Sequence, residues 1–333
     1  MFLYISSITL CLSCGGVYSV NYTSGKADKA VLEECKNFIP HLSTKQHKGD
    51  RGRIGVFGGS EEYTGPPYFG AMASLRTGTD MVYLFCASPA AIPIKSYGPE
   101  LMVLPCLDSK HAFSKIKPWL ERIHGVLIGP GLGRNETVVK NIVKMIGFLK
   151  EDVNSAIPMV FDADAFYIMY SNPELLQEYP KQVYLTPNYE EFRQLVSVVL
   201  GISQNSVNPH EHLKALAEKL GPKVTIVLKG KVDKIAQGDS VVTSNKMTGS
   251  PRRCGGQGDM LAGCLAALAV WQDMAETWRP QVHLTQEQIV GYAASALLKL
   301  ANEMAYKEKG RSLIASDILS KLHPAFDILF DEL

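Results

Sequence analysis

The residues in this sequence that are best suited to chemistry gather in one glycine-rich run. The run extends from Gly249 to Gly263 and contains Gly255, Gly256 and Gly258, with Asp259 directly behind them. Glycine permits positive φ angles and a close approach of the backbone to a ligand. Apolar residues follow, so a helix is expected to begin here. The free N–H groups and positive dipole end of such a helix favour an anion such as phosphate.

Asp259 has two interpretations at this position. The helix dipole alone favours an acidic residue in a first turn. A carboxylate beside a phosphate cradle can also take a hydroxyl proton while the charge of phosphoryl transfer is neutralised. The sequence contains no GxxxxGK[ST] loop, and no GxGxxG opens a helix after the first predicted strand. This argues against a P-loop NTPase and against an ordinary Rossmann dehydrogenase.

The elements that must position this run are predicted from hydrophobic patterning. Short β-type runs alternate with helical patterns, which predicts an α/β fold with a mainly parallel sheet covered on both faces. From Gly258 onward the chain is predicted to be mostly helical. The predicted strands are 54–57, 81–86, 125–128, 158–161, 183–185 and 224–228, with a hairpin of 232–235 and 240–243 and helices at 68–76 and 136–149.

Small and polar residues follow these predicted strands repeatedly. In open parallel sheets a ligand lies outside the carboxyl ends of the strands, so these residues are expected to share one rim. They are Gly58, Gly59, Gly129, Gly131, Gly133, Asp162, Asp164, Asn188, Lys229 and Gly230.

The motifs resemble a known family. The segment Gly255–Asp259, followed by Leu261-Ala-Gly263, resembles the anion-hole and catalytic-Asp element of the ribokinase superfamily. Together with the motifs listed below, it is similar to the ATP-dependent NAD(P)H-hydrate dehydratases, over roughly residues 48–323. The further motifs are Gly58-Gly-Ser60, Gly129-Pro-Gly-Leu-Gly133, Asp162-Ala-Asp164, Thr186-Pro-Asn-Tyr-Glu-Glu-Phe192 and Lys229-Gly-Lys-Val-Asp233.

This resemblance implies a ribokinase-like three-layer α/β/α fold and a carbon–oxygen lyase. The reaction would restore NADH and NADPH from their hydrates, NADHX and NADPHX, at the expense of ATP. A phosphate ester leaves more readily than hydroxide, which explains how a kinase fold can serve a dehydratase. Mg²⁺ would bridge the nucleotide phosphates. A functional link to an epimerase of the hydrates is implied as well.

The resemblance also assigns residues to three roles. The catalytic group comprises Asp259 with the backbone of Gly256, Gln257 and Gly258. The hydrated dinucleotide would bind Gly131, Gly133, Asn188, Tyr189, Glu190, Glu191, Phe192, Arg193, Gln194 and Asp259. ATP would bind Lys229, Gly230, Lys231, Val232, Asp233, Gly249, Ser250, Pro251, Arg252, Arg253, Cys254, Gly255, Gly256, Gln257 and Gly258.

Simpler interpretations exist for several of these residues. Asn188 also has the type and position of a helix N-cap, with Glu190 and Glu191 in the first turn. Lys229 could be a solvated loop charge. Glu191 is a candidate for ordering Mg²⁺ or water, and the pair Asp162 and Asp164 could contact metal or substrate or could only cap a helix.

Composition narrows the function classes. Hydrophobic residues make up 46% of the chain, which excludes disorder as the main architecture. Lys and Arg total 34 against 33 Asp and Glu, so binding of nucleic acid by bulk charge is not expected. The eight His show no metal-binding spacing, and no residue is assigned to a protein-bound metal. Buried free thiols are expected at Cys86, Cys106, Cys254 and Cys264.

Three regions are predicted along the chain. Residues 1–20 are apolar and uncharged, a candidate signal or targeting segment. Its cleavage would indicate the secretory route; otherwise a cytoplasmic or mitochondrial location is expected. Residues 21–45 are polar and are interpreted as a linker with one short helix, and residues 46–330 as one catalytic domain. No membrane span is expected in this domain, because its longest apolar run, Met260–Trp271, is short of the roughly 20 residues required.

Two alternatives to the dehydratase stay open at this level. A small-molecule alcohol kinase of the same superfamily would keep the glycine run and Asp259. A nucleotide-binding regulatory relic would retain the fold without turnover. Self-association into a homo-oligomer is also left open.

Overall fold

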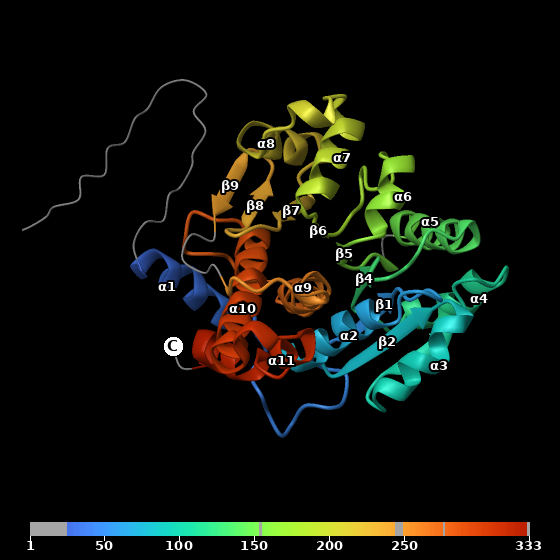
Figure 1. Ribbon diagram of the computed structural model, residues 1–333, viewed down its shortest axis with the longest axis horizontal. Coiled ribbons are helices and arrows are strands. Elements are labelled where there is room, and N and C mark those ends of the chain that lie inside the picture. The colour runs from blue at the N-terminus through green and yellow to red at the C-terminus, as the bar shows by residue number, and fades with distance from the viewer. Residues whose placement is uncertain (1–24, 153–154, 244–248, 276, 332–333) are drawn as a thin grey trace, which may run out of the picture.

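Short, continuous apolar runs build a twisted sheet through the middle of the molecule (Figure 1). The structure is a computed structural model that describes residues 25–152, 155–243, 249–275 and 277–331. Its strands are β1 (Arg53–Phe57), β2 (Met81–Cys86), β3 (Met102–Pro105), β4 (Gly125–Ile128), β5 (Met159–Phe161), β6 (Val183–Leu185), β7 (Val224–Leu228), β8 (Lys234–Gln237) and β9 (Ser240–Thr243).

The strand order is β3-β2-β1-β4-β5-β6-β7-β8-β9. All pairs from β3 to β7 are parallel, and β8 and β9 are antiparallel additions at one edge. In the register of these strands, Gly55 in the middle of β1 lies opposite Tyr83 of β2 and Val126 of β4. The predicted mainly parallel sheet is therefore confirmed.

The helices alternate with the strands along most of the chain. They are α1 (Gly25–Glu34), η1 (Cys35–Asn37), α2 (Gly65–Thr77), α3 (Ser88–Tyr97), α4 (Ala112–Leu120), α5 (Glu136–Glu151), α6 (Ala165–Ser171), α7 (Tyr189–Leu200), η3 (Gln204–Ser206), α8 (Pro209–Leu220), α9 (Gln257–Met274), α10 (Gln286–Lys309), η4 (Gly310–Ser312), α11 (Ala315–Leu319), α12 (Leu322–Phe326) and η5 (Asp327–Asp331).

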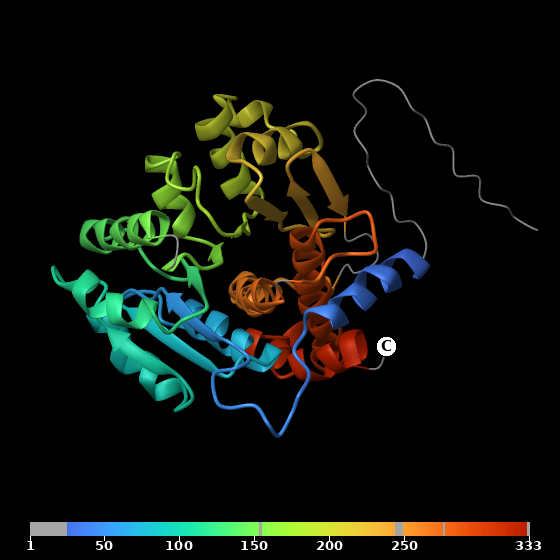
Figure 2. The ribbon, with the colours of Figure 1, turned by 180° about the vertical axis from the view of Figure 1, so that it is seen from behind.

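Helices cover both faces of the sheet. Successive strand residues point to opposite faces, and accordingly Val56 packs into one core cluster and Phe57 into the other. The first cluster lies under α2, α9 and α10, and the second under α4 to α8. Figures 1 and 2 show α9 between α2 and α10, inside the curve of the sheet. This is the expected three-layer arrangement.

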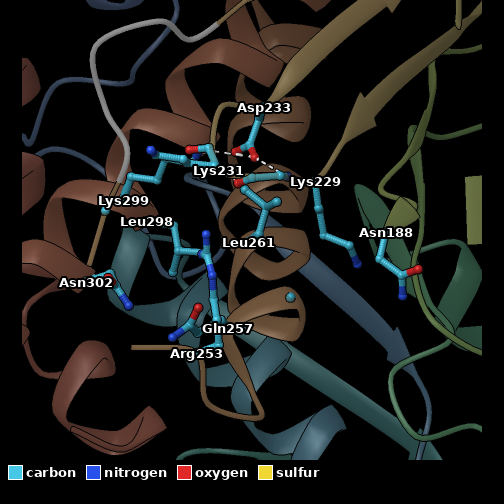
Figure 3. A pocket seen from close by; sticks show the side chains of 13 residues that line it. Asn188, Lys229, Lys231, Asp233, Arg253, Gln257, Leu261, Leu298, Lys299 and Asn302 are labelled. Carbon is cyan, nitrogen blue, oxygen red and sulfur yellow. Dashed lines mark hydrogen bonds and ion pairs between the residues drawn. The ribbon is translucent and has the colours of Figure 1, made fainter. Parts of the chain in front are cut away.

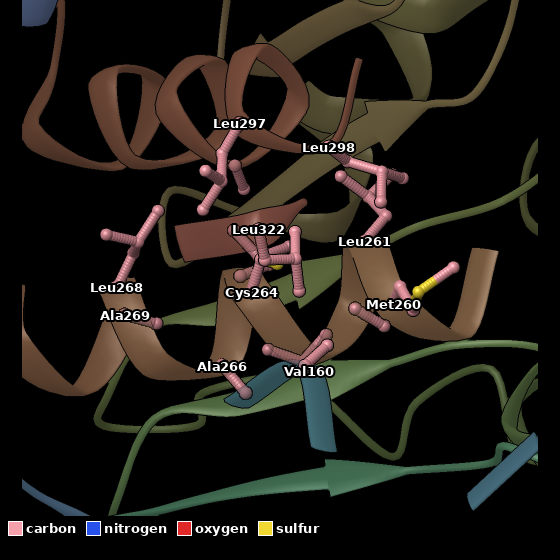
Figure 4. Packing of buried hydrophobic residues seen from close by; sticks show 14 of the residues in the cluster. Val160, Met260, Leu261, Cys264, Ala266, Leu268, Ala269, Leu297, Leu298 and Leu322 are labelled. Carbon is pink, nitrogen blue, oxygen red and sulfur yellow. The ribbon is translucent and has the colours of Figure 1, made fainter. Parts of the chain in front are cut away.

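Helix α9 is apolar on all sides because it is enclosed on all sides. Its residues from Met260 to Gln272 are all buried. Figure 4 shows several of them, among them Leu261 and Cys264, between Leu297 and Leu298 of α10 on one side and Val160 of β5 on the other. A Cβ atom on Gly263 would lie 2.1 Å from the carbonyl oxygen of Gly70 in α2, so only glycine permits this backbone approach. Ser74 fixes the same crossing by donating its hydroxyl to the carbonyl of Gly263, at 2.9 Å. The start of α9 is thus held rigidly.

The segment interpreted as a linker contains the expected short helix, α1, but it is packed onto the domain. Cys35 and Phe38 are buried, and the Phe38 ring contacts Trp278 at a centroid distance of 4.7 Å. Glu34 accepts hydrogen bonds from the Trp278 indole and the Gln281 backbone N–H. Polar composition did not predict this packing. The three-region division itself stays a prediction.

Smaller differences concern element ends. The first hairpin strand starts at Lys234 rather than at 232, because Gly230 to Asp233 form a hydrogen-bonded turn. The predicted 68–76 helix extends over Gly65–Thr77. Cys86, Cys106 and Cys264 are buried free thiols as expected, whereas Cys254 is only half-buried.

One prediction, the candidate leader at 1–20, falls outside the described residues. Within the described ranges, no helix combines the length and the apolar character that crossing a membrane requires.

Candidate active site

The glycine run forms the start of α9, as predicted. Gly256 is the N-cap residue with φ 92° and ψ −18°, in the left-handed region that favours glycine. A Cβ atom on Gly256 would lie 2.8 Å from the Cβ of Ala315 in α11, whereas one on Gly255 would meet nothing within 4 Å. Asp259 lies in the first turn behind the free N–H groups. The predicted helix start with a glycine at its cap is therefore present, and anion binding there stays a prediction.

A buried ion pair lies beside this helix start. Asp162 follows β5, is only 1% exposed, and accepts hydrogen bonds from the Lys229 ammonium at 2.6 Å and the Thr186 hydroxyl at 2.9 Å. The Lys229 side chain is 19% exposed, so its interpretation as a solvated charge is wrong. A Cβ atom on Gly258 would lie 3.2 Å from the Lys229 Nζ, which places the ammonium against the first turn of α9.

Glu191 joins this cluster from the start of α7. The Glu191 backbone N–H donates to Asn188 Oδ1 at 3.0 Å, and Glu191 Oε2 accepts from the Asn188 N–H at 2.7 Å. This capping box confirms the cap interpretation of Asn188. The same Oε2 lies 3.9 Å from the Lys229 Nζ, so the helix cap also brings a carboxylate to the site.

Burial and charge shift the pKa values of the cluster. Burial raises the pKa of the Asp259 carboxyl from 3.8 to about 7; the Asp162 carboxylate adds to the rise and Lys229 opposes it. Burial disfavours the charged Lys229, but the carboxylates of Asp162 and Glu191 outweigh burial and raise its pKa. Burial also raises the pKa of Glu191. Asp259 is thus poised to exchange a proton near neutrality beside a permanently charged lysine.

A cavity of about 420 Å³ opens at this junction (Figure 3). It contains many residues that the sequence predicted: Asn188, Lys229, Gly230, Lys231, Asp233, Gly249, Arg253, Gln257 and Gly258. It also contains four residues that the prediction missed, Leu261, Leu298, Lys299 and Asn302. Leu298, Lys299 and Asn302 belong to α10, which carries no recognisable motif, so only packing brings them here.

The remaining predicted ATP residues lie outside the cavity lining. The Ser250 backbone N–H donates to Asn302 Oδ1 at 2.6 Å, and Arg252 Nε donates to the Leu313 carbonyl at 3.4 Å. The others outside the lining are Val232, Pro251, Cys254, Gly255 and Gly256.

Asn188 lines the first cavity, whereas the predicted dinucleotide residues Gly131 and Gly133 lie in the loop that follows β4. Gly131 and Gly133 have φ angles of 58° and 73°, and the Gly133 N–H donates to Asp164 Oδ2 at 2.9 Å. Asp164 therefore orders this loop, and its side chain makes no cap hydrogen bond to α6. A second cavity, of about 360 Å³, borders Gly133. There the buried Ser60 hydroxyl has no partner among the described residues.

The side chains of the segment 188–194 point in different directions, some into the core and some toward solvent. Phe192 is fully buried in the core beneath α7, while Tyr189 is exposed. Arg193 donates to the Gln204 carbonyl at 2.9 Å and pairs with Glu190 at 2.8 Å, and Gln194 is bonded to Gln204. Where the chain is described, no group of three His, Cys, Asp or Glu side chains forms a metal cluster.

Comparison with known proteins identifies the family. Residues 54–323 match the protein-family model described as NAD(P)H-hydrate dehydratase. The ATP-dependent (S)-NAD(P)H-hydrate dehydratase of Bos taurus is 40% identical over 311 residues, which cover 92% of this chain and 92% of the bovine one. That of Homo sapiens is 40% identical over 301 residues, 90% of this chain and 85% of the human one.

Solved structures share the fold. A ribokinase-like superfamily protein from Enterococcus faecalis superposes with a TM-score of 0.71 at 22% identity, over 91% of this chain and 95% of that one. The ADP/ATP-dependent NAD(P)H-hydrate dehydratase from Bacillus subtilis, co-crystallised with ATP/Mg²⁺, gives 0.63 at 19% identity, over 90% and 97%. The fold is therefore ribokinase-like, and this chain belongs to the NAD(P)H-hydrate dehydratase family.

Proposed function

We propose that this chain uses ATP to dehydrate NADHX and NADPHX, and so restores NADH and NADPH. One observation carries the proposal beyond family membership. The half-buried Asp259 carboxyl, the Lys229 ammonium and the N-terminus of α9 meet beside a cavity large enough for much of a nucleotide. This combination is suited to moving a phosphoryl group onto a hydroxyl.

The two substrates are assigned to the two sides of the Asp162 cluster. ATP lies in the 420 Å³ cavity, where Lys229, Lys231 and Arg253 supply positive charge for its phosphates. The hydrated dinucleotide lies against the Gly131–Gly133 loop and the N-terminus of α7. The (S) in the names of the relatives implies one epimer of the hydrate, so an epimerase acting on the other is the expected functional partner.

The chemistry then follows in two steps. Asp259 takes the proton from the ring hydroxyl, whose oxygen forms a bond to the γ-phosphorus as the bond to ADP breaks. The N–H groups of Gly256 to Gly258 and the Lys229 ammonium stabilise the charge on the transferred group. The lone pair of the ring nitrogen next expels the oxygen as phosphate. A proton leaves the adjacent ring carbon, and the double bond is restored.

Mg²⁺ fits this site as a companion of the triphosphate. Carboxylate oxygens are hard ligands of the type Mg²⁺ prefers, and it commonly binds through one or two of them plus phosphates. Asp162 Oδ2 has no hydrogen-bond partner among the described residues, and Glu191 is adjacent. These two carboxylates would hold the ion, which would neutralise phosphate charge.

The rate should depend on pH through Asp259. Its carboxyl accepts a proton only when ionised, and its pKa is raised to about 7. At saturating substrates, kcat is therefore expected to rise from pH 6 to pH 8 and then level off, since Lys229 stays charged throughout. Initial rates measured at saturating substrates from pH 6 to pH 8 check this profile. A flat profile would exclude Asp259 as the titrating base.

A pair of glycine variants tests the anion loop. Gly256→Ala forces a side chain into a left-handed backbone and against Ala315, so the loop must shift. We expect its Kd for ATP, measured by calorimetry, to rise about tenfold or more, as strain of 1–3 kcal/mol implies. Gly255→Ala is the matched control and should bind like the parent protein, because its Cβ meets open space. Equal affinities for both variants would contradict the proposed phosphate position.

A direct assay tests the function. Enzyme, NADHX, ATP and Mg²⁺ are mixed, and recovery of the absorbance band of reduced nicotinamide is recorded, with ADP measured in parallel. We expect both to appear in equal amounts, and neither without ATP. Absence of recovery together with phosphorylation of a small alcohol would instead indicate an alcohol kinase.

A further inference from the structure

Three polar side chains of α10 form a buried stripe that faces the loops of the nucleotide cavity. Ser295, Lys299 and Asn302 are spaced by four and three residues, which places them on one face of the helix. All three are more than nine-tenths buried. Buried polar groups must be hydrogen-bonded to be tolerated, and the partners of this stripe are the two loops assigned to ATP.

The first partner is the 229–233 loop. The Lys299 ammonium pairs with Asp233 Oδ1 at 3.1 Å and donates to the carbonyl oxygens of Lys231 at 3.0 Å and Gly230 at 3.4 Å. The Ser295 hydroxyl donates to Asp233 Oδ2 at 2.5 Å. An ammonium has three donors, so Lys299 has none left for a ligand. Its task is to hold the loop.

The second partner is the Gly249–Ser250 turn. Asn302 Oδ1 accepts the Ser250 backbone N–H at 2.6 Å. A Cβ atom on Gly249, whose φ is 64°, would lie 3.2 Å from the same oxygen, which shows how closely the turn is seated. Figure 3 shows Lys299 and Asn302 on the same side of the cavity, opposite Lys229.

We propose that Ser295, Lys299 and Asn302 are positioning residues of the nucleotide site, which fix the distance between the two loops that enclose ATP. This deepens the function proposed above and rests on it for the identity of the nucleotide. The 229–233 loop begins with Lys229, so its anchoring also sets the ammonium beside α9. Loss of these contacts therefore weakens ATP binding and leaves the affinity for the dinucleotide unchanged.

The test is calorimetric titration of the full chain with ATP and Mg²⁺, which needs no turnover. Lys299→Met should raise the Kd for ATP about tenfold or more, since hydrogen bonds to a charged group are lost. Lys299→Arg, which keeps the charge, should recover part of the lost affinity. Ser295→Ala should raise the Kd several-fold. Ser295 does not line the cavity, so its effect must pass through Asp233. Lys307→Met, an exposed lysine of the same helix, is the control and should bind normally.

Kinetic and stability measurements distinguish a specific effect on ATP binding from a general loss of stability. The KM for ATP should rise in Lys299→Met and Ser295→Ala while the KM for NADHX stays unchanged, with Tm recorded for each variant. Parent-like Kd values in both variants, even with a lowered Tm, would overturn the proposal and leave the stripe as core packing. A parent protein that binds ATP but never restores reduced nicotinamide would instead overturn the proposed function, and leave the positioning role standing.

Discussion

Replacing Asp259 by alanine is expected to lower turnover by at least about a hundredfold while ATP binding stays nearly intact. The carboxyl is the only one in the first turn of α9, and the mechanism requires it to remove the hydroxyl proton. In the proposed site, ATP contacts the N–H groups and lysines around Asp259 rather than the carboxylate itself. Single-turnover absorbance recovery and calorimetric ATP titration measure the two quantities separately.

The matched control is Asp273→Ala. Asp273 lies near the other end of α9 and pairs with Lys181 at 2.8 Å, so its loss should leave turnover unchanged. Unchanged turnover in Asp259→Ala, or an equal loss in both variants, would remove Asp259 from the mechanism.

The isosteric variant Asp259→Asn gives a second readout of the same residue, its effect on stability. The folded-state pKa of about 7 exceeds the ordinary 3.8, so the folded protein binds this proton more tightly than the unfolded chain. Stability from this group is therefore fully present below about pH 4 and is lost as pH rises to about 7. This rise of the pKa from 3.8 to about 7 corresponds to at most about 4 kcal/mol of unfolding free energy. Asp259→Asn should accordingly be more stable than the parent at pH 8, in urea unfolding, while being inactive.

Lys229→Met is the second large expected effect. It removes the ammonium that meets both Asp162 and the first turn of α9, so kcat/KM for ATP should fall by about a hundredfold or more, the range for lost electrostatic stabilisation. Stability should fall too, by about 3–5 kcal/mol, because Asp162 is left buried and unpaired. Steady-state kinetics and urea unfolding measure the two.

Lys231→Met provides the comparison. Lys231 lines the same cavity but is exposed, so we expect a change of several-fold at most and no loss of stability. If Lys229→Met lost only stability and kept its kcat/KM, Lys229 would be a structural partner of Asp162 and nothing more.

Sequence patterns predicted the parts of the fold and site that depend on neighbouring residues, such as apolar strands, glycine conformations and helix caps. Apolar runs located the parallel strands, and the glycines before α9 located the loop at its start, because few residues other than glycine adopt the backbone of Gly256. Asn188 and Glu191 also followed the capping pattern that their spacing predicts.

The parts that sequence patterns missed depend on contacts between distant segments. Lys299 and Asn302 reach the cavity only because α10 packs across the loops that precede α9. The resemblance assigned Lys229 to ATP, but only the fold shows that its ammonium pairs with Asp162, 67 residues earlier. Phe192 stands within a segment predicted to bind substrate, yet its side chain points into the core. A motif identifies a segment, and packing decides which of its side chains face the ligand.

The central claim is that ATP converts the ring hydroxyl into a leaving phosphate. It is tested most directly by following the hydroxyl oxygen. NADHX prepared with oxygen-18 in its ring hydroxyl is turned over with unlabelled ATP, and the released phosphate is analysed by mass spectrometry. The account predicts one labelled oxygen in each phosphate, because the hydroxyl oxygen becomes the bridge of the ester. Label found in water and absent from the phosphate would contradict it.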